Sequence, residues 1–354
     1  MAKAHRKAPD LDKLLAWYDA CARVLPWRSR PGDQPDPYHV WLSEIMLQQT
    51  TVATVGPYFL KFLDKWPTVH DLASANRDDV LANWAGLGYY ARARNLHKCA
   101  GEVSALGGRF PDTETGLKEL PGIGPYTAAA IASIAFNRSV VPVDGNIERV
   151  TARFFALTTP LPDVKPELRS SAQAFVHEKR PGDVAQALMD LGATICKPKS
   201  PGCSNCPLNK GCQGLAKGIA PDLPARAPKK QRPSRHAVMF WLTRPDGRVL
   251  LQKRPDKGLL GGMLGLPSTD WTEDLITEED ALSAAPVRLK WQQLPGIVGH
   301  TFTHFHLDVM VWAGQTSRKA KSEETWLLPD ELDDHAVPTL FRKVANHAER
   351  STVS

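Results

Sequence analysis

The sequence predicts a multidomain protein in which an all-α region is followed by a linker and a small α+β domain. From residue 11 to about 212, apolar residues recur at helical rather than alternating spacing, and Gly or Pro stands at the joins. Residues 214–235 are rich in Pro, Ala, Lys and Arg, and they lack apolar periodicity. Beyond them, two β-rich runs flank a Pro-Asp-Gly turn. We therefore expect an all-α region at 1–213, a linker at 214–235 and an α+β domain at 236–354.

The composition limits the class of protein further. A chain of 354 residues is long enough for two or three domains that each bury a core. Its 44 Lys and Arg against 38 Asp and Glu give a formal net charge of +6, which suits a polyanionic partner without requiring one. No run approaches the roughly 20 apolar residues of a membrane-spanning helix. We therefore expect a soluble, cytoplasmic protein.

The first helix of interest carries an acid in apolar surroundings. In "WLSEIMLQQTT" (41–51), Glu44 stands among Trp, Leu, Ile and Met. Asp36 and Pro37 have the pattern of an N-cap and a first-turn proline, which places Glu44 about two turns inside the helix. No Lys or Arg stands three or four residues away to pair with it. Glu44 is therefore either a tolerated helix acid or a chemical group whose pKa is raised by its surroundings.

A glycine-rich turn follows in "LKELPGIGPYTAAAIASIAF" (117–136). Gly122 and Gly124 let the backbone turn sharply, so that amides at the start of the next helix can point at a phosphate. About 20 residues later, "PVDGNIERV" contains Asp144, a good N-cap for a helix from Asn146 onward. From the residues alone, a capping role and a catalytic role for Asp144 are equally supported.

Four of the six cysteines lie close together in the chain. They have the spacing C-x6-C-x2-C-x5-C, and they are Cys196, Cys203, Cys206 and Cys212. Four thiolates this close can hold either zinc or a 4Fe-4S cluster, and the spacing alone does not decide between the two.

Taken together, the motifs resemble those of a known family. "LPW", "VWLSEIMLQQT", "GLGYYARARNLHK", "PGIGPYT", "VDGN" and "LMDLGATIC" are similar to the adenine DNA glycosylases of the MutY family, in the endonuclease III superfamily. Those enzymes remove adenine mispaired with 8-oxoguanine. The resemblance covers nearly the whole chain and implies a helix-hairpin-helix near 118–136. It also implies that the loop 196–212 holds iron and sulfur, as a 4Fe-4S cluster on the four cysteines.

The resemblance implies a division of labour between two carboxylates. Glu44 is expected to give a proton to adenine N7, and Asp144 to stabilise the oxocarbenium-like sugar, with a covalent bond to it as an option. Tyr126 and Asn146 are expected to orient these two groups. The residues expected to line the base pocket are Arg28 and Gln186.

A base stacked in a duplex must be flipped out before it can react. The expected substrate is double-stranded DNA containing A opposite 8-oxoguanine or G, bound by a monomer associated with the nucleoid. By resemblance Gln49 and Tyr89 probe the mispair, with Thr50 and Leu87 beside them. The residues expected to contact DNA in the helical region are Gln48, Gln49, Thr50, Leu87, Tyr89, Gly122 and Gly124.

The C-terminal domain resembles a Nudix-like fold that recognises a lesion. No Arg-Glu-x-x-Glu-Glu metal box follows "GLLGGMLGLP", so recognition rather than hydrolysis is expected. The family's lesion-reading residues match Phe302, Thr303 and His304, with Thr303 in place of the usual serine. That change keeps the hydroxyl and adds a methyl group. From the pattern alone, an ordinary alternating strand with exposed polar residues is the preferred interpretation of 302–306.

Two other functions remain open from the sequence. The relatives that cleave the strand carry a Schiff-base lysine in the hairpin, where this chain has Tyr126. A monofunctional glycosylase is therefore expected, and a bifunctional glycosylase/lyase of the endonuclease III kind is the nearest alternative. A non-catalytic iron-sulfur DNA-binding module is the second alternative, and in it neither Glu44 nor Asp144 would matter.

Overall fold

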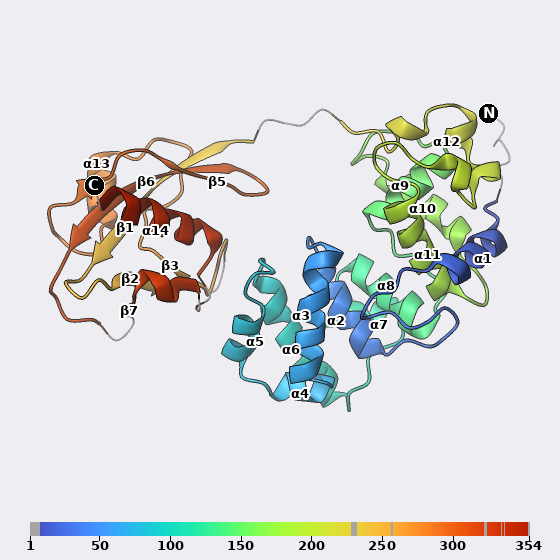
Figure 1. The fold of residues 1–354 in the computed structure, drawn as a ribbon, viewed down its shortest axis with the longest axis horizontal. Coiled ribbons are helices and arrows are strands. Elements are labelled where there is room, and N and C mark those ends of the chain that lie inside the picture. The colour runs from blue at the N-terminus through green and yellow to red at the C-terminus, as the bar shows by residue number, and fades with distance from the viewer. Residues whose placement is uncertain are drawn as a thin grey trace. The chain divides into compact units, whose positions relative to one another are not determined.

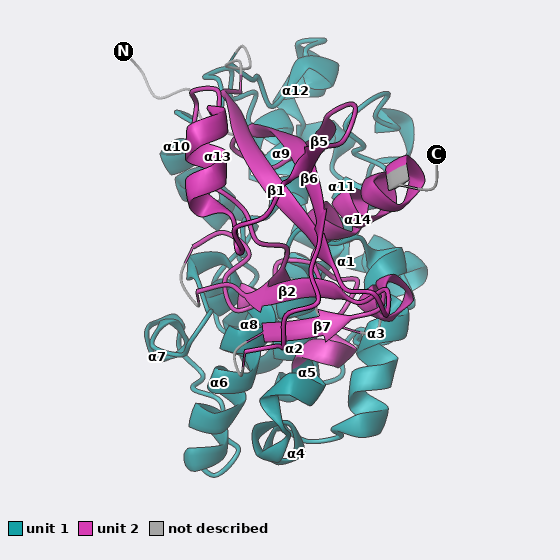
Figure 2. Cartoon of the chain, turned by 90° about the vertical axis from the view of Figure 1, so that its left-hand side faces the viewer, with its two compact units in different colours: residues 1–80, 92–228 teal, residues 81–91, 229–354 magenta. Residues whose placement is uncertain are grey.

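The computed structural model describes residues 8–227, 232–255, 258–321, 324–333, 335 and 337–352. The chain forms two compact units (Figure 2). One unit comprises Met1–Val80 and Arg92–Pro228, and the other comprises Leu81–Ala91 and Lys229–Ser354. The multidomain arrangement predicted from the sequence, helical first and α+β second, is confirmed.

The first part of the chain is helical throughout (Figure 1). In chain order the elements are α1 (Leu11–Cys21), α2 (Pro37–Leu47), α3 (Val52–Lys65), α4 (Val69–Ser74), α5 (Arg77–Asn83), α6 (Ala91–Ala105), α7 (Glu114–Lys118), α8 (Pro125–Phe136), α9 (Gly145–Phe154), α10 (Lys165–Ala172), η1 (Gln173–Phe175), α11 (Pro181–Thr194), η2 (Cys203–Asn205), η3 (Asn209–Gly211), α12 (Gln213–Ala216) and η4 (Ala220–Asp222).

The predicted linker is ordered in its first part. Residues 214–227 contain α12 and η4, and Ala220 and Leu223 are buried. The Leu161 amide donates to the Ala225 carbonyl at 2.8 Å, and Arg153 Nε donates to the Leu223 carbonyl at 2.9 Å. This segment therefore belongs to the helical unit, because its backbone is bonded to that unit although its sequence lacks apolar periodicity.

The helices that carry the site begin where the sequence predicts. The Asp36 carboxylate accepts from the Tyr38 amide at 2.7 Å, and Pro37 occupies the first turn of α2. The middle of α8 is buried, and its small alanines let α2 and α11 pack against it. A Cβ on Gly182 would lie 2.5 Å from the Ser133 carbonyl oxygen, so only glycine lets the start of α11 approach α8 this closely. Three helices from distant parts of the sequence thus meet at one place.

The C-terminal unit is built on a mixed sheet. Its strands are β1 (Ser234–Thr243), β2 (Val249–Lys253), β3 (Leu264–Gly265), β4 (Gln292–Gln293), β5 (Val298–Thr301), β6 (His306–Gln315) and β7 (Glu324–Leu327). The strand order is β3-β2-β1-β6-β4, with β5 also paired to β6 and β7 to β2. β1 and β6 run parallel in a register from Ser234 opposite His306 to Thr243 opposite Gln315, and the other pairs are antiparallel. The helical elements of this unit are α13 (Glu278–Ala284), η5 (Pro329–Asp333) and α14 (Thr339–Thr352).

Both faces of β1 are buried. Met239 and Trp241 belong to the same core cluster as Phe341 of α14, whereas Val238 and Phe240 pack with Ala281 of α13. Because both faces are buried, the sequence of β1 is a continuous apolar run and does not alternate between apolar and polar residues. Within the described ranges, no helix is long and apolar enough to cross a membrane.

Candidate active site

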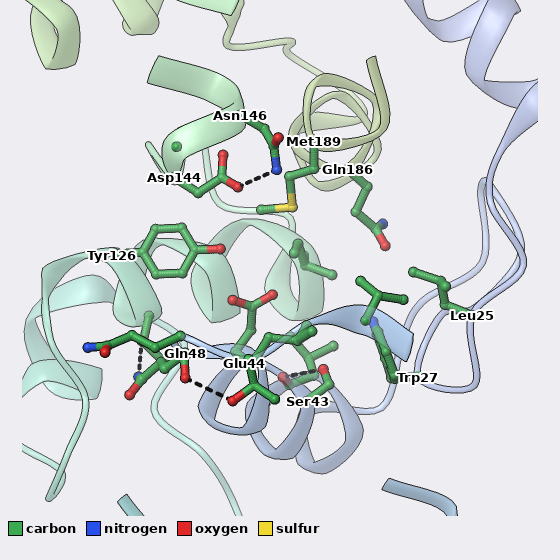
Figure 3. Close-up of a pocket in the computed structure, with 18 of the residues that line it drawn as sticks. Leu25, Trp27, Ser43, Glu44, Gln48, Tyr126, Asp144, Asn146, Gln186 and Met189 are labelled. Atoms are coloured by element: carbon green, nitrogen blue, oxygen red, sulfur yellow. Dashed lines mark hydrogen bonds between the residues drawn. The ribbon is translucent and has the colours of Figure 1, made fainter. Parts of the chain in front are cut away.

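A cavity of about 750 Å³ opens in the helical unit, within the usual size range of ligand pockets. Its walls come from α2, the hairpin before α8, the start of α9 and the middle of α11 (Figure 3). No lysine is found among the described residues that line it. The predicted residues that the cavity brings together are Arg28, Glu44, Gln48, Gln49, Thr50, Gly122, Gly124, Tyr126, Asp144, Asn146 and Gln186.

Glu44 is the buried acid of this cavity. It is 7% exposed and lies well inside α2, with its carboxylate directed into the cavity (Figure 3). Burial raises the pKa of Glu44 to about 7, and Asp144 adds to the rise, while the Tyr126 hydroxyl and Arg28 oppose it. Glu44 can therefore carry a proton near neutral pH, whereas an exposed glutamate could not.

Asp144 occupies the N-cap of α9, as the sequence predicts. Its Oδ1 accepts from the Ile147 amide at 2.7 Å, and its Oδ2 accepts from Asn146 Nδ2 at 2.9 Å. A helix N-terminus by itself favours the anion of a capping carboxylate. The pKa of Asp144 is nevertheless raised, because burial outweighs the capping bonds that lower it. The carboxylate is therefore held by donors yet poorly solvated.

Tyr126 stands in the first turn of α8, and its hydroxyl points toward the Glu44 carboxylate (Figure 3). Burial first, and then the two carboxylates Glu44 and Asp144, raise the pKa of Tyr126 well above its usual value. The phenol therefore keeps its proton and is available as a donor at this wall of the cavity.

Two arginines of α9 connect the site to the cysteine loop, and the sequence reasoning missed both. Arg149 donates to Asn146 Oδ1 at 2.9 Å and to the carbonyl oxygens of Gly192 and Cys196, each at 2.7 Å. Arg153 donates to the Lys197 carbonyl at 2.7 Å, and its Nη1 lies 3.3 Å from Cys196 Sγ. The signal was their spacing from Asn146, which puts positions 146, 149 and 153 on one face of the helix.

The four predicted ligand cysteines line one small cavity of about 30 Å³ together with Arg153. In the described part of the chain, no group of three or more His, Cys, Asp or Glu could hold a metal ion. A zinc site needs its thiolates within about 2.3 Å of one atom, whereas a cluster places several iron atoms between them. The four thiolates line a shared cavity with a guanidinium beside one of them, a donor set that both zinc and a thiolate-ligated cluster can use.

The residues predicted to read the mispair differ in exposure. Gln49 is exposed and has a left-handed backbone (φ 57°), while Gln48 Nε2 donates to Thr127 Oγ1 at 3.1 Å. In the segment Leu81–Ala91, Tyr89 is 53% exposed and also left-handed (φ 48°), whereas Leu87 is buried. A left-handed conformation is uncommon for residues with a side chain and is often found at functional sites. Gln49 and Tyr89 are therefore accessible to a partner and Leu87 is not, while their role at a mispair stays a prediction.

The hairpin before α8 requires its first glycine. Gly122 has φ 78°, and a Cβ there would lie 2.7 Å from Asn95 Cβ. Gly124 is the N-cap of α8 and, within the described residues, no side chain caps this helix end. Its first-turn amides can therefore face an external acceptor such as a phosphate.

The predicted lesion loop is a turn. Residues 302–305 connect β5 to β6, and the Phe302 amide donates to the Phe305 carbonyl at 2.9 Å. The alternating-strand interpretation of 302–306 is therefore wrong for four of its five residues. Phe302 stacks on Trp271 with ring centroids 5.5 Å apart, whereas Thr303 and His304 are exposed. An aromatic anchor thus presents two polar side chains at the tip of the turn.

Two family descriptions match this chain. Residues 42–174 match the HhH-GPD superfamily of base excision DNA repair proteins, and residues 238–347 match the NUDIX domain. A thermostable thymine-DNA glycosylase has a similar structure, with a TM-score of 0.51 and 28% sequence identity over 58% of this chain and 95% of its own.

Relatives along nearly the whole sequence are adenine DNA glycosylases. The adenine DNA glycosylase of Homo sapiens is 37% identical in a match that covers 94% of this chain and 72% of the human protein. The chain belongs to the adenine DNA glycosylase family. The enzyme of Buchnera aphidicola subsp. Baizongia pistaciae is 33% identical over 75% of each chain. Membership makes this protein an adenine-specific DNA N-glycosylase of base excision repair, and it sets aside the non-catalytic alternative.

Proposed function

We propose that the cavity receives an adenine flipped out of a duplex in which it is mispaired with 8-oxoguanine or guanine, and that its N-glycosidic bond is hydrolysed there. The observation that carries the proposal is the pair of carboxylates on its wall. Glu44 has a pKa of about 7, and Asp144 is held by two hydrogen bonds at a helix N-terminus. Excising a base needs an acid for the leaving group and an anion for the sugar, which is how two carboxylates divide the work in glycoside hydrolysis.

Glu44 acts as the general acid in this proposal. Protonating adenine at N7 lets the base leave as a neutral molecule instead of an anion. With a pKa near the working pH, Glu44 is protonated in a large fraction of the enzyme and is still acidic enough to give the proton up. The Tyr126 hydroxyl, which points toward the carboxylate, orients it (Figure 3).

Asp144 stabilises the sugar after the base begins to leave. The Ile147 amide and Asn146 fix both of its oxygens, so the carboxylate does not reorganise when positive charge develops at the sugar. The cationic sugar favours the ionised form of Asp144 and so opposes the effect of burial on its pKa. Addition of water to the sugar then completes hydrolysis and leaves an abasic site.

DNA contact in the helical unit is assigned to Gln48, Gln49 and Thr50, which line the cavity. Gln49 probes the mispair from an exposed left-handed position, and Tyr89 of the segment Leu81–Ala91, also exposed and left-handed, is assigned the same role. The amides at the start of α8, behind Gly122 and Gly124, bind a phosphate. The protein acts as a monomer on nucleoid DNA.

The C-terminal unit reads the base opposite the adenine. Phe302 is anchored on Trp271, and Thr303 and His304 offer a hydroxyl and an imidazole to the edge of 8-oxoguanine. The four cysteines of 196–212 would hold a 4Fe-4S cluster, which when bound supplies a structural crosslink of this loop. Arg149 and Arg153 orient the loop against α9 through its carbonyl oxygens.

A single-turnover glycosylase assay tests the function. Duplexes carry A opposite 8-oxoguanine, A opposite G, or an oxidised pyrimidine. We expect adenine release from the first two, faster opposite 8-oxoguanine, with an intact strand at the abasic site. Strand cleavage with a borohydride-trappable imine would assign the chain to the bifunctional alternative. Equal rates opposite 8-oxoguanine and guanine would remove the proposed role of the C-terminal unit.

A further inference from the structure

A buried aspartate on α11 binds two arginines of the cavity wall. Asp190 is 1% exposed and does not line the cavity itself. Its Oδ1 accepts from Arg23 Nε at 2.6 Å, and its Oδ2 accepts from the Arg23 amide at 3.0 Å and from Arg28 Nη1 at 2.7 Å. Arg23 and Arg28 both line the cavity that holds Glu44. Asp190 therefore determines where two cations stand in the candidate active site.

The position of Arg28 matters because this cation opposes the protonation of Glu44. Its side chain is 8% exposed, so its field is weakly screened by water. Among the ion pairs of the described residues, Arg28 pairs with Asp190, and no pair joins it to Glu44. A direct pair with Arg28 would keep Glu44 ionised and unable to give a proton.

We propose that Asp190 is a positioning residue that holds Arg28 on the cavity wall and away from Glu44, so that Glu44 can carry the proton it gives to adenine. The proposal rests on the proposed acid role of Glu44. Asp190 also offsets one of the two positive charges that would otherwise repel a protonated adenine and a cationic sugar. Arg28 remains free to use its other guanidinium nitrogens on the bound base.

The groups that face Glu44 from the surrounding elements are few. Tyr126 on α8, Asp144 at the start of α9 and Arg28 in the segment before α2 interact with it, and Gln186, the residue of α11 one turn before Asp190, is uncharged. Arg28 is the cation among these groups. Loss of the ion pair with Asp190 would move Arg28 or leave its charge uncompensated. This is therefore the direct way in which α11 can alter the protonation of Glu44.

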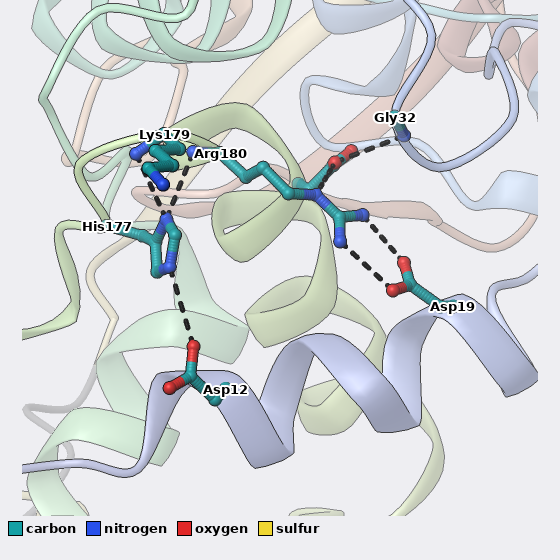
Figure 4. A network of polar contacts seen from close by, with 7 residues as sticks. Asp12, Asp19, Gly32, His177, Lys179 and Arg180 are labelled. Atoms are coloured by element: carbon teal, nitrogen blue, oxygen red, sulfur yellow. Dashed lines mark hydrogen bonds and ion pairs between the residues drawn. The ribbon is translucent and has the colours of Figure 1, made fainter.

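The competing explanation is that Asp190 only ties the segment before α2 to α11. A control carboxylate on the same helix, Asp183, separates the two explanations. Figure 4 shows the guanidinium of its partner Arg180 beside Asp19, with Gly32 nearby. Asp183 accepts from Arg180 Nε at 2.7 Å and from the Gly32 amide at 3.2 Å, and Arg180 also pairs with Asp19. Asp183 thus joins the same two parts of the chain, yet neither it nor Arg180 lines the cavity.

The test compares the pH dependence of adenine excision by Asp190→Asn and Asp183→Asn in the full-length protein. Single-turnover rates are measured on a duplex with A opposite 8-oxoguanine, corrected for the active fraction. The wild-type rate falls as pH rises through the pKa of Glu44. We call this fall of the rate the alkaline limb of the pH profile. In Asp190→Asn we expect the limb to move to lower pH by about one unit, the usual effect of a nearby charge. Excision then falls about tenfold at pH 8 and hardly changes at pH 5, and Asp183→Asn keeps the wild-type limb.

Removing the second partner shows whether Asp190 acts through Arg28. In the double variant Asp190→Asn with Arg28→Gln, the limb should move back most of the way to its wild-type position. Arg28→Gln alone should move the limb to higher pH than in the wild type. A folded Asp190→Asn with the wild-type limb overturns the proposal. Should Asp190→Asn not fold, an unmoved limb in Arg28→Gln overturns it instead. A limb that persists in the residual activity of Glu44→Gln would refute the acid role itself, which is a different result.

Discussion

Replacing Glu44 by Gln should raise stability and abolish activity together. The pKa of Glu44 is about 7 in the fold against 4.5 for the free side chain, so the folded state resists ionisation of this group. A carboxyl with a raised folded-state pKa contributes its full stability below pH 4.5 and loses it as pH rises through 7. The difference of 2.5 pKa units means that the wild type loses about 3 kcal/mol of its free energy of unfolding above pH 8. A Gln side chain does not ionise, so the variant keeps this free energy.

Urea denaturation at pH 5 and pH 8 measures this difference. We expect Glu44→Gln to be more stable than the wild type by up to about 3 kcal/mol at pH 8 and by less than about 1 kcal/mol at pH 5. Glu178 is exposed and provides the control. Glu178→Gln should change the free energy of unfolding at neither pH 5 nor pH 8.

Single-turnover excision should move in the opposite direction. Gln keeps the shape of the side chain but cannot give adenine a proton, so we expect a loss of about 100-fold to 10,000-fold with duplex binding intact. A variant that is more stable at pH 8 but fully active would return Glu44 to a structural role. A variant that is inactive but no more stable would refute the burial of the charged form as the source of the raised pKa.

Three further changes test the rest of the site. Asp144→Asn keeps an acceptor for the Ile147 amide, so the free energy of unfolding should change by less than about 1 kcal/mol. Excision should fall at least about 100-fold, because the anion beside the sugar is lost. Retained excision would contradict the sugar-stabilising role. Cys203→Ser should lose iron by metal analysis together with duplex affinity, and stoichiometric zinc in the native protein would contradict the cluster. His304→Ala should reduce the preference for 8-oxoguanine over guanine by about 1 to 3 kcal/mol in paired single-turnover rates, with an unchanged preference as the contrary result.

The sequence was informative where the signal is local. Asp36 and Pro37 start α2, and Asp144 caps α9, because a cap needs only the residues beside it. The position of Glu44 inside an apolar helix likewise indicated a group that burial would perturb, and its pKa of about 7 agrees with that reasoning. Local patterns therefore indicated where both carboxylates lie on their helices, and their catalytic roles stay predictions.

The features that were missed depend on packing between distant segments. The bonds from Arg149 to Gly192 and Cys196 exist only because α9 packs on α11 and the cysteine loop. The direction of the Asp144 pKa shift follows from burial by the whole cavity wall, which no cap pattern records. Asp190 reads as one polar position on an amphipathic helix, and its two arginine partners lie more than 160 residues away in the sequence.

The parallel pairing of β1 with β6 has a consequence for biosynthesis. The paired residues are 72 apart in the chain, from Ser234 to His306, so the centre of this sheet forms late and only after a long loop has closed. Until β6 leaves the ribosome, β1 is an edge strand whose run "AVMFWL" (237–242) is strongly apolar. A chain interrupted between residues 243 and 306 would therefore expose a template for intermolecular strand addition, and such truncated products should aggregate rather than persist as soluble fragments.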